Sequence, residues 1–378
     1  MFSRSSRVAL GLLGAASAAV AMAQVAQKQG AEPASPAAAG SEKPWVPPGT
    51  KGSPIIGEIF HAQVLLDAAG FSPGVIDGKK GMSLTQAIRG FQESRGLDTT
   101  GKLDMPTRQA LLQDARPSTV KVKLGPDDVK STYVYPLPKD PEQQYKLPFL
   151  GYRNMLEKVA ERYHTTPATV VALNGPQALI GLGQVLRLPN VVPTSRDYSG
   201  VPGNGGRLMN LLNVDGRQPH GSYIVVEKSA GVLKVYSGEA PKDSESKAGK
   251  GGKSVPSDSE KGRLVAQFPV TMGSTHDPLP IGDWKVTTYA FLPPFHYQPD
   301  LFWDAKDKST DHMLPPGPNG PVGVAWLDLT KKHYGIHGTP EPSTIGRAES
   351  HGCIRMTNWD VMRLARIMKP GFPAKFEA

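Results

Sequence analysis

The residue type best suited to nucleophilic chemistry occurs once in this 378-residue sequence, at Cys353 in the stretch ESHGCIRM (residues 349–356). A thiol becomes a strong nucleophile when a nearby base takes its proton, and histidine is the usual base. Two histidines, His337 and His351, are close to it in sequence. Because a sole cysteine has no internal disulfide partner, these neighbours predict a reactive thiol.

His337 is the better candidate for the base. His351 is two residues from Cys353, too close to face it easily on a strand or in a tight turn, so we expect it to have a supporting role. The turn-rich TPEPSTIGRAES separates His337 from the cysteine, and this is enough chain to bring two strand ends together. In KHYGIHG alternate side chains face opposite sides, so His337 points away from the apolar Ile336. The adjacent N–H groups of Gly352 and Cys353 are suited to an oxyanion hole.

The sequence also permits structural or metal-binding roles for these residues. Cys353 could be a small buried apolar residue, and His337 a hydrogen-bonded core histidine. His337, His351 and Cys353 together supply three nitrogen or sulfur donors, enough to begin a zinc site. Arg355 could be a solvated cation at a strand end. The glycine and histidine neighbours of the cysteine favour chemistry over each of these, and we predict no metal.

The region that must position these residues, 221–378, has the pattern of a mainly β, sandwich-like domain. Strand-like runs recur from SYIVVEKSAGVLKVYSG to HYGIHG, and only TNWDVMRLARIM near the end is helical, with Thr357 as its N-cap. A polar, low-complexity insert at 237–262 loops out of the first hairpin. We reject its GKGGKS as a phosphate-binding loop, because the glycine spacing and the preceding strand are missing.

The end of the chain resembles the L,D-transpeptidase family with a YkuD-type catalytic domain. HGTPEPSTIGRAESHGCIRM is similar to the family's signature, a histidine–glycine pair followed by Ser/Thr-His-Gly-Cys. The segments VTMGSTHDPLPIGDWKV and LPPGPNGPVGVAWLDL resemble upstream blocks of the family, and the resemblance covers about residues 221–375. One departure is STHDPLPIG, which is longer than the family's Thr-Pro-x-Gly and lies in a supporting loop.

The resemblance implies a role for each residue of the motif. Cys353 is expected to be the nucleophile and His337 the base that activates it. Arg355 is expected to contact a substrate carboxylate, which its planar guanidinium binds with two hydrogen bonds, and Gly338 to let substrate approach closely. Oxyanion and positioning roles fall to Ser350, His351 and Gly352.

The reaction implied by the resemblance forms cross-links in peptidoglycan. Cys353 attacks the carbonyl of the third residue of a stem peptide, releases D-alanine and forms a thioester. An amine of a second stem then resolves the thioester and makes a 3-3 cross-link, with no metal or organic cofactor. With water as the acceptor the same site is an L,D-carboxypeptidase, and attack on an existing cross-link makes it an endopeptidase. A non-catalytic wall-binding protein is the alternative of another class.

Residues before 116 are predicted to comprise a signal peptide (1–23), a flexible linker (24–53) and a helical domain (54–115). MFSRSSRVALGLLGAASAAVAMA has the charged start, apolar stretch and A-x-A site of a secretory signal. In the domain, SLTQAIRGFQESRG predicts a helix with Ser83 as its N-cap and Gly96 as its stop. Its apolar face is Leu84, Ala87, Ile88 and Phe91. AIRGFQESRGL and TTGKLDMPTRQALL resemble the peptidoglycan-binding domain family.

Residues 146–192 predict a second small α+β unit. One helix follows Met155, and a second starts at TTPATVVALNG with Thr166 as N-cap and Pro167 at its first position. GQVLRLP then predicts a strand. This order resembles the LysM family, whose members bind N-acetylglucosamine-containing glycans, although the N-terminal strand of that family is poorly marked in EQQYKLPFLGYRN.

The formal net charge of +9 is compatible with an anionic partner but does not identify one. The sequence has no Arg- and Lys-rich recognition helix and no aromatic RNA-binding motif, so we predict no nucleic-acid partner. After the signal, no apolar stretch is long enough to span a membrane. The predicted partners are therefore donor and acceptor peptidoglycan stem peptides and glycan strands. The predicted location is outside the cytoplasm, in the periplasm or cell envelope.

Overall fold

The computed structural model describes residues 46–239, 262–301, 310–347 and 352–378, apart from positions 47, 49, 52, 54 and 275. The predicted signal peptide, most of the predicted linker and most of the polar insert lie outside these ranges, as do Ser350 and His351. Within the described part of the chain, no helix has the length and apolar character needed to cross a membrane.

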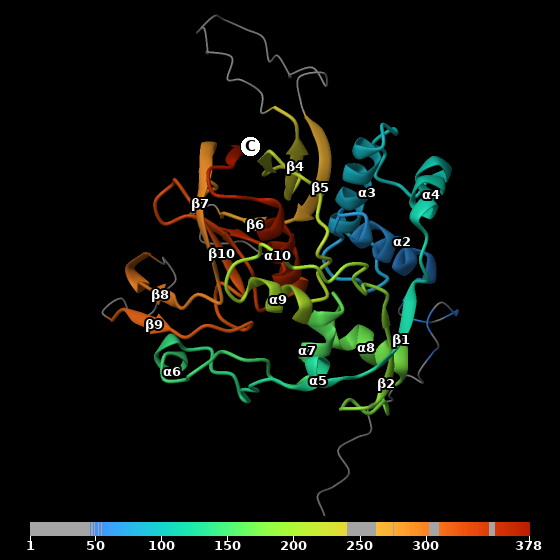
Figure 1. The fold of residues 1–378 in the computed structure, drawn as a ribbon, viewed down its shortest axis with the longest axis horizontal. Helices are drawn as coiled ribbons and strands as arrows, with labels where there is room; N and C mark the ends of the chain where they lie inside the picture. The colour runs from blue at the N-terminus through green and yellow to red at the C-terminus, as the bar shows by residue number, and fades with distance from the viewer. Residues whose placement is uncertain are drawn as a thin grey trace, which may run out of the picture. The chain divides into compact units, whose positions relative to one another are not determined.

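The C-terminal half is built on one mixed sheet of nine strands, and this confirms the prediction of a mainly β region. Their order is β5-β4-β3-β13-β7-β10-β11-β12-β6. The two edge strands, β5 (Arg263–Pro269) and β6 (Thr271–Met272), are separated in the chain by one residue, so the sheet curls round on itself (Figure 1). The others are β3 (Tyr223–Glu227), β4 (Val232–Ser237), β7 (Gly282–Phe291), β10 (Ala325–Leu329), β11 (Gly335–His337), β12 (Ile354–Arg355) and β13 (Pro373–Glu377).

Helix α10 (Asn358–Ile367) packs into the core of this sheet. Thr357 caps it as predicted, because its hydroxyl accepts a hydrogen bond from the backbone N–H of Asp360 at 3.2 Å. Trp359 is fully buried. A separate two-stranded hairpin, β8 (Phe295–Tyr297) with β9 (His312–Leu314), extends from the sheet.

The first helical region contains α2 (Gly57–Ala68), α3 (Met82–Ser94) and α4 (Met105–Leu111), followed by a short 3-10 turn, η1 (Leu112–Asp114). The predicted apolar face of α3 is buried. Gly96 ends the helix with φ +65°, and the N–H of Leu97 donates to the carbonyl of Gln92 at 2.9 Å.

The prediction that Ser83 caps helix α3 is wrong. The helix begins one residue earlier, at Met82, and Gly81 occupies the N-cap position without a side-chain hydrogen bond. Ser83 is therefore already inside the first turn. The carbonyl of Gly81 instead accepts from the backbone N–H and the hydroxyl of Thr85, both at 3.1 Å.

The second unit begins and ends with strands that pair with each other. Strand β1 (Thr119–Lys123) pairs antiparallel with β2 (Val185–Pro189), and α7 (Met155–Arg162) and α8 (Pro167–Asn174) lie between them in the chain. Thr166 caps α8 as predicted. The partner strand thus lies before the predicted range of 146–192. The stretch between β1 and α7 contains two short helices, α5 (Pro126–Val129) and α6 (Pro141–Gln144), and α9 (Gly205–Leu211) follows the unit.

The helical region and the sheet share one apolar core. Phe91 of α3 belongs to the same buried cluster as Tyr223, Tyr236 and Leu264 of the sheet, and α3 lies beside β5 (Figure 1). The opposite side of the helical region packs against the second unit, where Phe60 and Val64 join a cluster with Val159 and Leu186. The three regions described by residues 46–378 therefore pack as one body.

A buried charged network lies where these regions meet. The guanidinium of Arg363 on α10 binds both carboxylate oxygens of Asp67 on α2, at 3.0 and 2.7 Å. The Nδ1 atom of His164 lies 3.2 Å from each of the same two oxygens, and the imidazole ring of His164 stacks on Trp359. Burial alone would raise the pKa of Asp67, but Arg363 and then His164 lower it well below its usual value. The carboxylate therefore stays ionised in the interior.

Candidate active site

Cys353 and His337 are brought together by two neighbouring parallel strands. In the pairing of β11 with β12, Ile336 is opposite Ile354 and His337 is opposite Arg355. Both isoleucines are fully buried in the core. Because side chains alternate along a strand, His337 and Arg355 lie on the other face. Cys353 immediately precedes β12 and lines the same cleft as these two residues.

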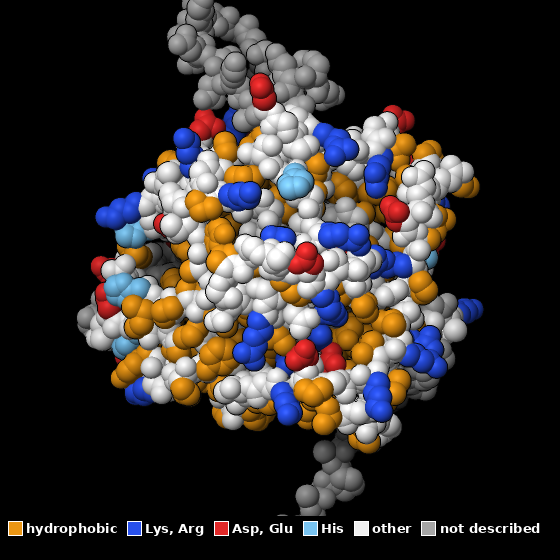
Figure 2. Space-filling view, in the orientation of Figure 1, with side chains coloured by type: hydrophobic (Ala, Val, Ile, Leu, Met, Phe, Trp, Pro, Cys, Tyr) orange, Lys and Arg blue, Asp and Glu red, His pale blue; other side chains and the backbone are white. Residues whose placement is uncertain are grey.

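That face lines a cleft of about 790 Å³. Its floor includes Cys353, His337 and Arg355, and its walls come largely from the segment 293–301 and from residues 331–334. Figure 2 shows histidine side chains gathered around a hollow on the side where Figure 1 shows β8 and β9. Cys353 and His337 thus line one cleft that is large enough to hold a substrate.

His337 is held as a neutral imidazole. Its Nδ1 atom lies 2.7 Å from the carbonyl oxygen of Gly338, and since a carbonyl only accepts, Nδ1 carries the proton and the lone pair is on Nε2. Burial first, and the charge of Arg355 second, lower the pKa of His337 to about 3, against the raising effect of the Gly338 hydrogen bond. Its ring stacks on Trp326 with 5.3 Å between centroids. The imidazole is therefore fixed in the form and orientation of a proton acceptor.

Cys353 is partly exposed and lies in a mixed electrostatic environment. Its Sγ atom is 3.8 Å from the carbonyl oxygen of His333. Burial raises the pKa of the thiol above its ordinary value of 9.0, while a hydrogen bond from the Gly335 backbone and the charge of Arg355 oppose the rise. The resting pair is therefore a thiol and a neutral histidine.

Gly352 is a position that only glycine fits. Its φ is +98°, which is costly for residues with a Cβ. A Cβ there would also lie 2.7 Å from a ring carbon of Tyr334. The chain entering the cysteine therefore passes close over the Tyr334 ring.

Gly338 has a packing role in this structure. It is buried and is not among the residues that line the cleft. A Cβ there would lie 2.1 Å from Oδ1 of Asn358, and its carbonyl fixes the tautomer of His337. Its predicted contact with substrate stays a prediction, and the predictions for Ser350 and His351 concern residues outside the described ranges.

Within the described ranges, no group of three or more His, Cys, Asp or Glu residues is arranged to hold a metal ion. The interpretation of His337, His351 and Cys353 as ligands includes one residue outside those ranges.

The sequence did not indicate several residues that shape the cleft. Trp326, which stacks on His337, is one of them. Three others, Lys139, Pro141 and Gln144, come from the stretch between β1 and α7, almost two hundred residues before His337. The only sign in the sequence was that neither predicted domain accounted for that stretch.

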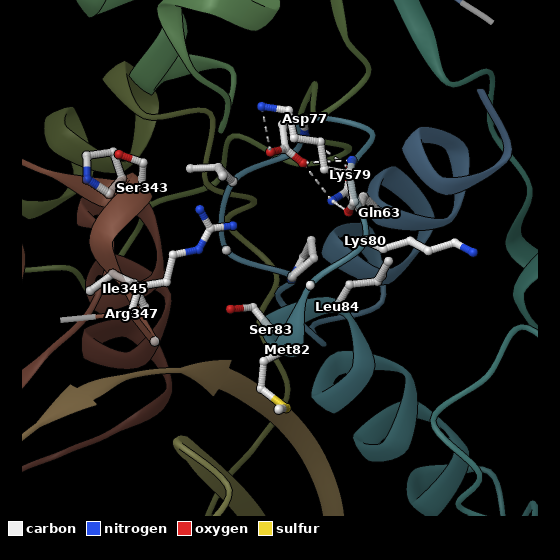
Figure 3. Close-up of a pocket in the computed structure, with 16 residues that line it drawn as sticks. Gln63, Asp77, Lys79, Lys80, Met82, Ser83, Leu84, Ser343, Ile345 and Arg347 are labelled. Atoms are coloured by element: carbon white, nitrogen blue, oxygen red, sulfur yellow. Dashed lines mark hydrogen bonds and ion pairs between the residues drawn. The ribbon is translucent and has the colours of Figure 1, made fainter. Parts of the chain in front are cut away.

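The loop that joins His337 to the cysteine segment contacts both N-terminal regions. On one side, a cavity of about 70 Å³ separates residues 342–347 from residues 73–84 of the helical region. Figure 3 shows the Arg347 guanidinium pointing into this space, with Ser83 facing it from α3. On the other side, Glu341 accepts a hydrogen bond from Arg153 at 2.8 Å.

Comparison with known families assigns two parts of the chain. Residues 258–375 match the L,D-transpeptidase catalytic domain, and residues 57–111 match the family described as "Putative peptidoglycan binding domain". The chain thus combines a β-rich L,D-transpeptidase catalytic domain with an N-terminal peptidoglycan-binding domain. These two resemblances are confirmed at this level, and the resemblance of residues 146–192 to the LysM family stays a prediction.

Individual relatives match shorter stretches. "Putative L,D-transpeptidase YkuD" of Bacillus licheniformis is 38% identical over 112 residues, which cover 30% of this chain and 53% of the relative. The protein of the same name from Bacillus subtilis is 59% identical over 54 residues, 14% of this chain and 33% of the relative. This chain therefore spans about half or less of these curated relatives. In a solved structure, L,D-transpeptidase 3 of Mycobacterium tuberculosis, the match is 16% identical with a TM-score of 0.28 and covers 41% of this chain and 60% of that one.

Proposed function

We propose that this protein is a peptidoglycan L,D-transpeptidase that forms 3-3 cross-links through a thioester on Cys353 and releases D-alanine. The observation that carries the proposal is that His337 of β11 and Cys353, which immediately precedes the adjacent parallel strand β12, line one large cleft. A thiol beside a neutral imidazole is the minimum apparatus for cysteine acyl transfer.

The protonation states on the two residues define the first half of the reaction. Nε2 of His337 accepts the thiol proton as sulfur attacks the carbonyl carbon of the third stem residue. The bond from that carbon to the amine of D-alanine then breaks, and the imidazolium returns the proton to the departing amine. Cys353 is left as a thioester.

The second half repeats these steps with a different nucleophile. The amine of a second stem attacks the thioester carbon, His337 takes the amine proton, and the carbon–sulfur bond breaks. The proton then returns to sulfur, which restores the thiol. If water is the acceptor, the same steps give a tripeptide, so the acceptor alone separates transpeptidase from carboxypeptidase.

In both halves of the reaction, groups around the sulfur atom of Cys353 stabilise the negative charge that develops. The N–H groups of Gly352 and Cys353 are the proposed donors to the oxyanion, with Ser350 and His351 supporting that turn. Arg355 shares the cleft face with His337. Its proposed role is to bind a stem carboxylate and to stabilise negative charge on sulfur.

The N-terminal regions are proposed to hold the polymer near the cleft. The match of residues 57–111 to a peptidoglycan-binding family supports wall binding by the helical region. Strand β1 pairs with β2 around α7 and α8, although α5 and α6 also lie between β1 and α7. This pairing supports a LysM-like, glycan-binding unit there. The proposed location is the cell envelope, where peptidoglycan is found.

The experiment that tests the proposal is mass spectrometry of the protein and its products after incubation with tetrapeptide muropeptides. The expected results are a thioester adduct on Cys353, free D-alanine and 3-3 dimers. Cys353→Ala should abolish all three, while Lys369→Ala, at an exposed site that does not line the cleft, should retain them. Turnover by the Cys353→Ala protein would overturn the proposal, and tripeptides without dimers would make the enzyme a carboxypeptidase.

A further inference from the structure

The stretch between β1 and α7 includes a segment, residues 131–150, that we call the strap. At its start the N–H of Val134 donates to the carbonyl of Tyr152 at 2.9 Å. At its end the N–H of Leu150 donates to Pro316 at 2.9 Å, and the N–H of Asn319 donates back to Leu150 at 3.0 Å. Both ends of the strap are therefore fixed, the second one directly to the catalytic region.

The middle of the strap forms one wall of the active-site cleft. Lys139, Pro141 and Gln144 line the same cleft as Cys353. The ring of Tyr145 stacks on His312 of β9, with centroids 4.6 Å apart and planes 8° apart. In Figure 1, α6 of the strap lies beside β9. The cleft is thus closed on this side by chain that belongs to the N-terminal part of the protein.

The charges that line the cleft are mainly positive. Lys139 comes from the strap, Lys331 and Lys332 from the segment after β10, and Arg355 from β12. Asp277 is the one carboxylate among the lining residues that the structure describes. Like charges that surround one low-dielectric space attract a ligand of the opposite sign. The chemistry of this cleft therefore favours an acidic peptide.

We propose that the strap is a substrate-binding wall and that Lys139 is a specificity residue that pairs with a carboxylate of the stem peptide. This inference rests on the proposed function, because it takes the stem as the occupant of the cleft. The strap selects acidic stems, and the strands β11 and β12 carry out the reaction.

The test is binding of an acidic stem tripeptide, which lacks the terminal D-alanine and is not turned over. Fluorescence anisotropy compares wild type, Lys139→Glu and Lys130→Glu, with the free-acid tripeptide and with the same tripeptide amidated at its carboxyl groups. Lys130 is the matched control, because it has the same charge, is exposed, precedes the strap and does not line the cleft.

Reversing the charge at Lys139 should weaken binding of the free-acid tripeptide by about three- to tenfold, the size expected for a partly solvated ion pair. Binding of the amidated tripeptide should change by less than twofold, and Lys130→Glu should leave both unchanged. Equal affinities of the Lys139→Glu and Lys130→Glu proteins for the free acid would overturn the role of Lys139.

A second pair of variants tests the wall itself. Tyr145→Ala removes the stacking on His312 and should raise KM for tetrapeptide stems several-fold with little change in kcat. The control Lys369→Ala, at an exposed site outside the strap and the cleft, should change neither. An unchanged KM in Tyr145→Ala would contradict the proposal that the strap is a substrate-binding wall. The two proposals can fail separately. If wild type binds the acidic tripeptide in a Lys139-dependent manner but never releases D-alanine from tetrapeptide stems, the proposed reaction is wrong and the role of the strap in binding is supported.

Discussion

At the scale of single residues, the active site is governed by burial. Burial favours the neutral form of both partners, lowering the pKa of His337 to about 3 and raising the pKa of Cys353. We therefore expect the proton to move only when substrate is present to accept the electron pair of sulfur. A neutral thiol should also resist oxidants, since the thiolate is the reactive form.

The first prediction concerns alkylation of Cys353 by iodoacetamide, a neutral reagent. Because the pKa of the thiol is raised above its ordinary value of 9.0, the rate at pH 7 should be lower than that of a free model thiol and should still be rising, without a plateau, at pH 9. Arg355→Gln should move this profile to higher pH, since the charge of Arg355 lowers the pKa of the thiol. Stopped-time mass spectrometry measures the rate. A plateau that begins near pH 6 would instead indicate a resting thiolate–imidazolium pair.

At the scale of elements, Glu161 links the second unit to the catalytic region. It lies on α7 and is buried. Its carboxyl group accepts hydrogen bonds from the hydroxyl of Tyr152 at 2.5 Å and from the side-chain amide of Asn358 at 2.8 Å. The side-chain oxygen of Asn358 in turn accepts from the N–H of Val324 at 3.1 Å. One carboxyl group thereby fixes the start of α10 against the segment before β10.

The next prediction is a pH-dependent stability difference between wild type and Glu161→Gln. Burial raises the pKa of Glu161 to about 7 from 4.5, so its contribution to stability is full below pH 4.5 and is lost as pH rises through 7. Relative to wild type, Glu161→Gln should gain about 2 to 3 kcal/mol between pH 5 and pH 8. Urea unfolding at the two pH values measures this. The exposed Glu142→Gln is the control, and a pH-independent difference would refute the buried, protonated carboxyl.

At the scale of the whole molecule, residues 46–378 share continuous cores. The bidentate pair of Asp67 with Arg363 crosses from the helical region to α10 at the centre of these contacts. Removing one partner of a buried pair leaves the other uncompensated. The helical region is therefore a structural part of the catalytic body as well as a candidate binding module.

We predict that Asp67→Asn lowers the stability of the whole body by about 3 to 5 kcal/mol, the usual cost of breaking a buried pair. Unfolding should remain a single transition, because the cores are continuous. Coincident curves from tryptophan fluorescence and circular dichroism measure this, and Asp98→Asn, at an exposed loop position, is the control. Two separate unfolding transitions would contradict the conclusion that the helical and catalytic regions unfold as one body.

The sequence predicted those features that depend on local pattern. The buried face of α3, the caps Thr166 and Thr357, and the strand alternation that turns His337 away from Ile336 were all readable from spacing. Features that depend on contacts between distant positions of the chain could not be predicted in this way. Strand β1 pairs with a strand more than sixty residues later, and Asp67 meets Arg363 across 296 positions, so neither leaves a local signal.

One feature of the sheet bears on solubility. The outer edge of β5 is paired at Gln267, whose N–H donates to the carbonyl of Gly70 at 3.0 Å and whose carbonyl accepts from the N–H of Ser72 at 2.9 Å. Unpaired strand edges invite other chains to add strands. We therefore expect the helical region to protect this edge of the sheet from aggregation. A truncated chain that begins after residue 115 would expose this edge and the apolar surface of Leu264 beside it.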